Sequence, residues 1–356
     1  MSRSTVPTPH SHATRRLLGR AAAVAAVATF AGVGGLAPAY AQSGSSYVAL
    51  GDSYAAGEGG GNYVSDGTSC DRSPASYPNK VSAAKGLDLD LQACSGAVVA
   101  DLTSQYDALG SGTKLVTISV GGNDIGFAPV ITDCAKPAWW GDCGAAVDEA
   151  EKIATNTLPS RLDQAYATVR AKVPNAKVVV TGYPRMFNGE DCSVATFFSA
   201  DDTRRLNDAA DTLDSVNRAA ASRAGFGYVD VRDEFEGHQV CDSEEWIHNL
   251  SVRIPNSFHP KPAGYTAYAT EVGEQVTPST KAKTRRTTTM RTGGQTSSDT
   301  NRGKVGVADL NSPAARAAAH KAGVSQAEVD TLAAAQTKRA DQLTATEQVA
   351  LQRAKS

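Results

Sequence analysis

Apolar and polar positions form regular blocks along residues 42–277. Short apolar runs recur, and several of them contain almost no polar position, which is typical of strands that are buried on both faces. Longer segments lie between these runs, and their apolar positions follow the period of a helix. The expected strands are residues 46–50, 87–93, 115–120, 177–181 and 227–231.

The helical segments decide the fold class, because a helix between two strands allows both strands to run parallel in one sheet. Alternating strands and helices therefore predict an α/β fold of three αβα layers with a mostly parallel central sheet. No internal repeat interrupts this alternation. The expected helices are residues 77–85, 158–173, 203–224 and 264–276.

Residues 1–41 have the pattern of an export signal and not of a folded domain. A basic stretch with two consecutive arginines precedes an apolar run of small residues, which ends in the cleavage pattern Ala39-Tyr40-Ala41. Paired arginines also occur in signals of the twin-arginine type. We therefore expect a secreted, extracellular protein. No other segment is long and apolar enough to predict stable membrane insertion.

The C-terminal part of the chain differs in net charge from residues 42–277. Residues 42–277 carry 18 Lys and Arg against 31 Asp and Glu, a net charge of −13, which argues against a nucleic-acid partner. Residues 278–310 carry 7 basic and 2 acidic residues and few apolar ones, so we expect a basic, disordered linker. Residues 311–356 are rich in Ala and predict a small helical tail. This basic tail could contact anionic cell-wall material, whereas catalysis should not need it.

All six cysteines follow the expected signal. An even number of cysteines in an exported chain predicts disulfides, although the sequence alone leaves their pairing open. The chain has no Cys-x-x-Cys pair, no His-Glu-x-x-His motif and no EF-hand loop. We therefore expect neither a metal ion nor another cofactor.

Residues that can perform acyl transfer follow the expected strands. They are Ser53 after the first strand, Gly96 after the second, Asn123 after the third, and His259 after the fifth. Because parallel strands end at one edge of a sheet, these residues should converge there. His259 would remove the proton from Ser53 as the hydroxyl attacks a carbonyl. The backbone N–H groups of Ser53 and Gly96 and the side-chain amide of Asn123 would stabilise the oxyanion.

Four short motifs, in this order, resemble the GDSL, or SGNH, hydrolase family. They are Gly51-Asp52-Ser53, Gly96, Gly121-x-Asn123-Asp124 and His259-Pro260. The resemblance covers about residues 47–276 and is closest to secreted bacterial lipases, esterases and phospholipases with three disulfides. It implies an SGNH/flavodoxin-like fold, a serine carboxylic-ester hydrolase and an acyl-ester or lipid substrate. It also implies the consecutive disulfides Cys70–Cys94, Cys134–Cys143 and Cys192–Cys241.

One position departs from the family's pattern. The family usually has an Asp three residues before the catalytic His, where this chain has Asn256. We expect a Ser-His dyad in which the backbone carbonyl of Ser257 orients the ring of His259, with the side chain of Asn256 as the alternative. A third alternative is a carboxylate, for which the candidates are Asp242, Glu244 and Glu245.

Two other functions remain open at this point. An esterase that deacylates polysaccharides would use the same residues, and a secreted binding module without activity could use the same fold. The presence of both Ser53 and His259 favours the enzyme. We expect a monomer. An acyl pocket could be lined by aromatic residues, for which the candidates are Trp139, Trp140, Phe187, Phe197, Phe198 and Trp246.

Overall fold

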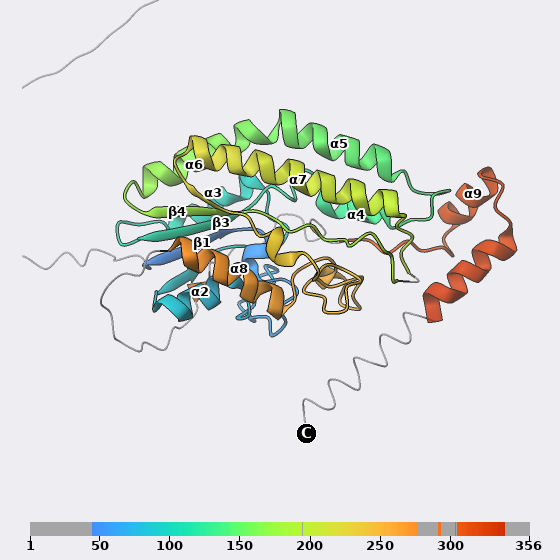
Figure 1. Ribbon diagram of the computed structural model, residues 1–356, viewed down its shortest axis with the longest axis horizontal. Coiled ribbons are helices and arrows are strands. Elements are labelled where there is room, and N and C mark those ends of the chain that lie inside the picture. Colours follow the sequence, from blue (N-terminus) through green and yellow to red (C-terminus); the bar gives the residue numbers. More distant parts are fainter. Residues whose placement is uncertain (1–44, 194, 277–290, 293–302, 304, 339–356) are drawn as a thin grey trace, which may run out of the picture. The chain divides into compact units, whose positions relative to one another are not determined.

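A parallel sheet forms the centre of the protein (Figure 1). The computed structural model describes residues 45–193, 195–276, 291–292, 303 and 305–338; the expected signal segment lies outside them. The strand order is β5-β4-β3-β1-β2-β6, and each neighbouring pair is parallel. The strands are β1 (Tyr47–Gly51), β2 (Leu89–Leu91), β3 (Leu115–Ser119), β4 (Lys177–Thr181), β5 (Gly227–Val229) and β6 (Arg291–Thr292).

Helices cover both faces of this sheet, so the predicted three-layer α/β fold is confirmed. Figure 1 shows α2 and α8 on one face and α5, α6 and α7 on the other. The helices are α1 (Ser53–Ala56), α2 (Tyr77–Lys85), α3 (Leu102–Gln105), α4 (Phe127–Cys134), α5 (Cys143–Asn156), α6 (Leu158–Lys172), α7 (Ala200–Arg223) and α8 (Pro262–Gln275).

The central strands are buried along their whole length. Every residue of β1 and β3 is buried, as expected for parallel strands with a helical layer on each side. Some polar side chains of this core form hydrogen bonds with one another, which offsets the cost of burying a hydroxyl. For example, the hydroxyl groups of Tyr47 and Thr117 lie 2.9 Å apart on neighbouring strands. The sheet is therefore a rigid support for the loops at its edge.

The connections change direction between β1 and β3. The chain passes from β1 to β2 on one side and then returns to place β3 on the other side of β1. This order is that of the flavodoxin-like sheets, in which ligands bind outside the carboxyl ends of the strands at the change of direction. Ser53 follows β1 and Asn123 follows β3, so both residues lie at this point of the sheet.

Part of the C-terminal segment returns to the sheet. Strand β6 lies within residues 278–310, where we expected a linker without structure, and it pairs with β2 at the sheet edge. Further along, Val305 is 2% exposed and belongs to the same apolar cluster as the central strands. Helix α9 (Pro313–Lys321) and a helix over residues 326–338 follow, in the part predicted to be helical.

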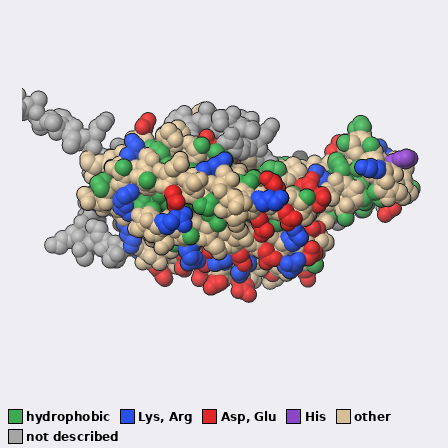
Figure 2. All heavy atoms as spheres, turned by 90° about the horizontal axis from the view of Figure 1, so that it is seen from above, with side chains coloured by type: hydrophobic (Ala, Val, Ile, Leu, Met, Phe, Trp, Pro, Cys, Tyr) green, Lys and Arg blue, Asp and Glu red, His purple; other side chains and the backbone are tan. Residues whose placement is uncertain are grey.

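Charges of both signs are mixed on the surface. Figure 2 shows Lys and Arg side chains interspersed with Asp and Glu side chains over one face of the molecule. Several of them form ion pairs between neighbouring helices, such as Arg205 with Asp148 and Arg223 with Asp163. Across the part of the chain that the structure describes, no helix is both long enough and apolar enough to cross a membrane.

Candidate active site

The turn after β1 presents the hydroxyl of Ser53. Gly51 has φ +130°, and a Cβ at this position would stand 2.1 Å from the carbonyl oxygen of Ser119, so only glycine fits. Asp52 then caps α1, because its carboxylate accepts a hydrogen bond from the Tyr54 N–H at 3.0 Å. Ser53 therefore opens a helix at the carboxyl end of a buried strand, where it is 5% exposed.

His259 completes the pair that the sequence predicted. It lies between the 3₁₀ helix η4 (Ile254–Asn256) and α8, and its Nε2 is 2.8 Å from Ser53 Oγ. Its Nδ1 is 3.0 Å from the carbonyl oxygen of Ser257. Burial lowers the pKa of His259 to about 4, against a smaller opposing effect of the Ser257 carbonyl. The ring is therefore neutral at neutral pH and can accept a proton from Ser53.

A strained backbone conformation at Phe258 orients His259. Phe258 has φ +60°, a conformation that is unfavourable for a residue with a side chain. Its carbonyl oxygen accepts a hydrogen bond of 2.9 Å from the hydroxyl of Tyr54, which belongs to the helix that carries Ser53. The backbone of His248 pairs with this segment through hydrogen bonds to both Phe258 and His259. The loop that contains His259 is thus fixed to the helix that begins with Ser53.

Asn256 has partners other than His259. Its Oδ1 accepts a hydrogen bond of 2.6 Å from the hydroxyl of Tyr63 and another of 2.7 Å from Arg253. The guanidinium of Arg253 also lies 4.1 Å from the ring centroid of Tyr63, as in a cation–π contact. Of the two predicted orienting groups, the carbonyl of Ser257 contacts His259, while Asn256 stabilises the loop that contains it.

Two carboxyl groups contact Arg253. Its guanidinium contacts Asp71 at 2.6 Å and the carboxylate of Glu58 at 3.4 Å. Burial, followed by the charge of Asp71, raises the pKa of Glu58 to about 8. Glu58 is therefore mostly protonated at neutral pH, which leaves the positive charge of Arg253 to be balanced chiefly by Asp71.

The three carboxylates considered as alternatives bind elsewhere. Glu245 forms an ion pair with Lys261 at 2.7 Å, and Asp242 accepts a hydrogen bond from Asn188 at 3.0 Å. Glu244 accepts a hydrogen bond of 3.4 Å from the indole of Trp246. The structure gives none of these side chains a hydrogen bond to His259.

Each predicted oxyanion donor keeps at least one N–H group without an acceptor among the described residues. Gly96 has φ +80°, which a residue with a side chain rarely adopts. The backbone N–H groups of Ser53 and Gly96 have no hydrogen-bond acceptor among the described residues. The amide of Asn123 donates one hydrogen bond of 3.0 Å to the carbonyl of Ala97, which fixes its orientation. A side-chain amide has two N–H donors, so one remains for a ligand.

Tyr183 connects the turn that carries Ser53 with the loop that carries Asn123. No role for this residue was predicted from the sequence. Its hydroxyl donates a hydrogen bond to Asp52 at 2.5 Å and accepts one from the Gly122 N–H at 3.2 Å. It therefore joins the turn that carries Ser53 to the loop that carries Asn123. Burial raises the pKa of Asp52 to about 7, opposed by the hydrogen bond from Tyr183. The available signal was the position of Tyr183 just after β4, at the same edge of the sheet.

An apolar cavity of about 60 Å³ opens beside Ser53. The six aromatic residues proposed from the sequence do not line it; Phe187 and Phe198 instead pack against Phe258. Apart from the site residues themselves, the lining is apolar, which suits a hydrocarbon chain. Its larger apolar members come from α4, α7 and the loops before them: Ile125, Phe127, Val130, Met186, Leu206 and Leu213.

A polar cleft lies on the other side of Asn123. This open cleft has a volume of about 600 Å³ and shares only Asn123 with the lining of the apolar cavity. Arg161 lines it, is half exposed, and contacts the buried carboxylate of Asp124 at 3.3 Å. The two sides of the site thus differ in polarity.

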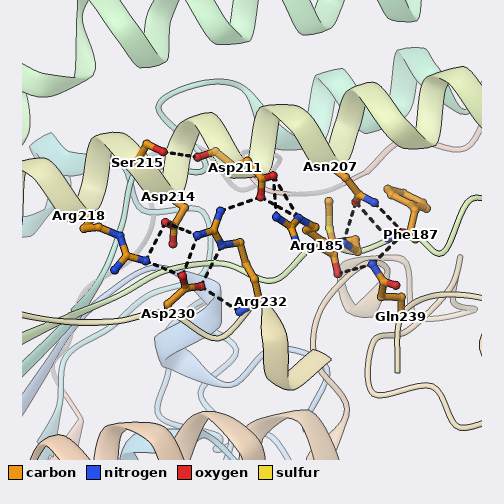
Figure 3. A network of polar contacts seen from close by, with 11 residues as sticks. Arg185, Phe187, Asn207, Asp211, Asp214, Ser215, Arg218, Asp230, Arg232 and Gln239 are labelled. Carbon is orange, nitrogen blue, oxygen red and sulfur yellow. Dashed lines mark hydrogen bonds and ion pairs between the residues drawn. The ribbon is translucent and has the colours of Figure 1, made fainter. Parts of the chain in front are cut away.

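Polar contacts to α7 hold the loop after β4, which supplies part of the cavity wall (Figure 3). Asn207 accepts hydrogen bonds from the backbone N–H groups of Met186 and Phe187 at 3.1 and 3.2 Å. Asp211 binds Arg185 and Arg232, so the segments after β4 and β5 are joined to the same helix. This network keeps Met186 in position at the cavity.

The six cysteines are joined in the consecutive order that we expected. The disulfides are Cys70–Cys94, Cys134–Cys143 and Cys192–Cys241. The first fixes the loop that contains Gly96, because the N–H of Ser95 also donates to the carbonyl of Cys70 at 3.1 Å. The second connects the end of α4 with the start of α5, next to the cavity wall.

Comparison with known proteins agrees with this arrangement. The chain is 40% identical over 221 residues to a lipase of Streptomyces rimosus, an alignment that covers 61% of this chain and 81% of the lipase. It is 41% identical over 224 residues to lipase 1 of Streptomyces coelicolor, with coverage of 61% and 81%.

Solved structures show the same relationship. Phospholipase A1 from Streptomyces albidoflavus is 40% identical with a TM-score of 0.61, and the match covers 65% of this chain and 98% of the phospholipase. The pattern of the GDSL-like lipase/acylhydrolase family matches residues 49–267, which include Ser53, Gly96, Asn123 and His259. The chain therefore belongs to the GDSL-like lipase/acylhydrolase family and is a carboxylic-ester hydrolase.

Proposed function

We propose that the protein is a secreted serine hydrolase that forms an acyl-enzyme on Ser53. The observation that carries this proposal is the 2.8 Å contact between Ser53 Oγ and the neutral, buried His259. As Oγ attacks the ester carbonyl, His259 Nε2 takes its proton. The resulting imidazolium then protonates the alcohol that leaves. Water, deprotonated by the same nitrogen, then attacks the acyl-enzyme; as the acyl–oxygen bond breaks, Nε2 returns this proton to Ser53 Oγ and the carboxylic acid is released.

The carbonyl of Ser257 takes the place of the usual third residue. It accepts a hydrogen bond from the N–H of His259 Nδ1, which fixes the tautomer in which Nε2 is free to act as a base. A carbonyl dipole stabilises imidazolium less than a full carboxylate charge does. The oxyanion is stabilised by the N–H groups of Ser53 and Gly96 and by the amide of Asn123, each supplying roughly 3 kcal/mol in enzymes of this type.

The two sides of the site indicate the substrate class. The apolar cavity beside Ser53 suits the acyl chain, and the polar cleft beyond Asn123 suits the alcohol part of the ester. We therefore propose acyl esters of lipids as substrates. Arg161, half exposed in the polar cleft, favours phospholipids among them, because a guanidinium binds phosphate well. The phospholipase A1 of Streptomyces albidoflavus is consistent with this second, narrower proposal.

A covalent probe tests the nucleophile. The purified mature chain should react with a fluorophosphonate, and peptide mass spectrometry should locate the adduct on Ser53. An adduct on another serine would refute the assignment. A panel of p-nitrophenyl esters, triacylglycerols and phospholipids then defines the substrate. Arg161→Ala should lower activity on phospholipids more than on p-nitrophenyl esters, which lack the phosphate.

Export and domain organisation belong to the same proposal. We propose cleavage after Ala41, a hydrolase domain over residues 42–277 and a C-terminal extension that supplies no catalytic group. All four site residues precede residue 278. N-terminal sequencing of the protein from culture medium should begin at Gln42; an intact residue 1–41 segment in that material would contradict secretion by cleavage.

A further inference from the structure

The C-terminal extension contacts the candidate oxyanion site. We call Gly303 and residues 305–310 the C-terminal strap. Gly303 lies so close to the site that a Cβ on it would stand 3.0 Å from the Cα of Gly96. The same position is 3.3 Å from the backbone nitrogen of Gly96 and 3.3 Å from Oδ1 of Asn123. The backbone N–H of Gly96, a proposed oxyanion donor, and the side-chain amide group of Asn123 therefore border Gly303.

The strap has further contacts on the wall of the site. The N–H of Gly306 donates a hydrogen bond of 2.7 Å to Oγ1 of Thr132, which belongs to α4. Between these two glycines, Val305 is 2% exposed and packs in the main apolar cluster. The strap is thus anchored by a buried side chain, by a hydrogen bond and by close backbone packing, which are three independent contacts.

These contacts place the strap where substrate must bind. An oxyanion donor acts on an oxygen about 2.7–3.1 Å away. A carbonyl oxygen held at that distance from the nitrogen of Gly96 competes for space with Gly303. We propose that the face formed by Gly96, Asn123 and Thr132 is a binding site for the chain's own C-terminal strap, and that the strap competes there with the ester substrate. This inference rests on the oxyanion roles in the proposed function.

Competition between the strap and the substrate changes KM and leaves kcat unchanged. Only molecules with the strap displaced bind substrate, so the apparent affinity falls in proportion to their fraction. If the strap is bound in about nine molecules of ten, its displacement lowers KM about tenfold and leaves kcat unchanged. A loss of ordinary stability or of a catalytic group would instead change kcat or the amount of active enzyme.

Two glycines allow a matched test in the full mature chain. Gly303 has φ +85° and touches the site, whereas Gly323 has φ +75° and has no atom within 4 Å of the position of a Cβ. Both substitutions to Ala raise the conformational free energy of a left-handed backbone by a similar amount. Only in Gly303→Ala does the new Cβ come close to Gly96. With p-nitrophenyl butyrate, Gly303→Ala should lower KM about tenfold at constant kcat, and Gly323→Ala should behave like the natural chain.

A second variant and a peptide complete the test. Thr132→Val removes the acceptor of the Gly306 N–H and should lower KM in the same direction by a smaller factor. A synthetic peptide with the sequence of residues 301–312 should inhibit Gly303→Ala competitively. Equal KM values in all four proteins, together with no inhibition by the peptide, would overturn the inference.

Labelling with the fluorophosphonate separates this inference from the proposed function. The strap inference predicts faster labelling of Ser53 in Gly303→Ala than in the natural chain. Labelling of Ser53 at equal rates in both proteins would refute the competition and leave the nucleophile assignment intact. Absence of any adduct on Ser53 would refute the proposed function itself.

Discussion

Ser53 and His259 lie 2.8 Å apart, yet the protein holds them by different means. Ser53 is positioned by local backbone structure: a buried strand, a glycine turn and a helix cap within seven residues. His259 is positioned by contacts between distant segments, including Tyr54 with Phe258 and Tyr63 with Asn256. The comparison teaches that one of two paired residues can be placed largely by local backbone structure, with Tyr183 as its long-range support, while the other depends on long-range polar packing throughout.

The largest expected effect tests the nucleophile side. Ser53→Ala should lower kcat by about four to six orders of magnitude, because the proposed acyl-enzyme forms on the hydroxyl that lies 2.8 Å from His259 Nε2. The side chain is small and supplies no core packing, so thermal unfolding should be unchanged. Steady-state kinetics and a melting curve measure both quantities. Substantial remaining turnover by pure Ser53→Ala would remove this residue from the mechanism.

Two substitutions, three residues apart, test how His259 is used and oriented. His259→Ala should lower kcat about as strongly as Ser53→Ala, since the two groups act as a unit. Asn256→Ala should cost less than about tenfold in kcat, because Ser257 orients the ring. It should instead lower the free energy of unfolding by roughly 1–3 kcal/mol, through lost hydrogen bonds to Tyr63 and Arg253. Equal kinetic losses for both variants would contradict the dyad.

Tyr183 connects the nucleophile turn to the oxyanion loop, and its hydroxyl can be removed alone. Tyr183→Phe should lower kcat about tenfold with little change in KM, because it loosens the alignment of Ser53 with Asn123. Tyr166→Phe is the matched control: it is equally buried, and its hydroxyl has no partner in the part of the chain that the structure describes. The same fall in kcat for both variants would show that the hydroxyl of Tyr183 has no positioning role.

The smallest expected effect concerns pH. A histidine with its ordinary pKa would place the acidic limb of activity near 6.5. Because burial lowers the pKa of His259 to about 4, kcat/KM should rise with pH through about 4 and change less than about twofold from pH 6 to 8 through this group. In the unfolded chain the ring binds its proton below about 6.5, so His259 lowers stability as pH falls from 6.5 towards 4. A limb centred at 6.5 would show that the ring titrates as if exposed.

The sequence was informative wherever structure is local. The run Val178–Val180 predicted β4 because both faces of that strand are buried. Helix α5 was missed, since its buried face consists largely of small residues such as Ala150 and Ala154 and of few large apolar ones. Strand β6 was missed because two residues carry no pattern of their own, and only the neighbouring β2 makes them a strand.

Within the site, too, local sequence patterns predicted some residues, while long-range contacts could not be predicted. Ser53, Gly96, Asn123 and His259 could be found because each follows a strand or precedes a helix in a recognisable order. The partners of Asn256 could not be found: Tyr63 is 193 positions away, and nothing in the local sequence links the two side chains. The contact between Gly303 and Gly96 is hidden for the same reason, because it joins residues from opposite ends of the folded chain.

The parallel pairing of β6 with β2 has a consequence for solubility. A terminal strand with free N–H and C=O groups invites pairing with a second molecule, and proteins protect such edges. Here the chain covers β2 with its own residues 291–292. Loss of the C-terminal extension, by proteolysis or by truncation before Arg291, would uncover β2, in which Leu89 and Leu91 flank a single charged residue. The extension therefore covers an edge that would otherwise be open to pairing with a second molecule.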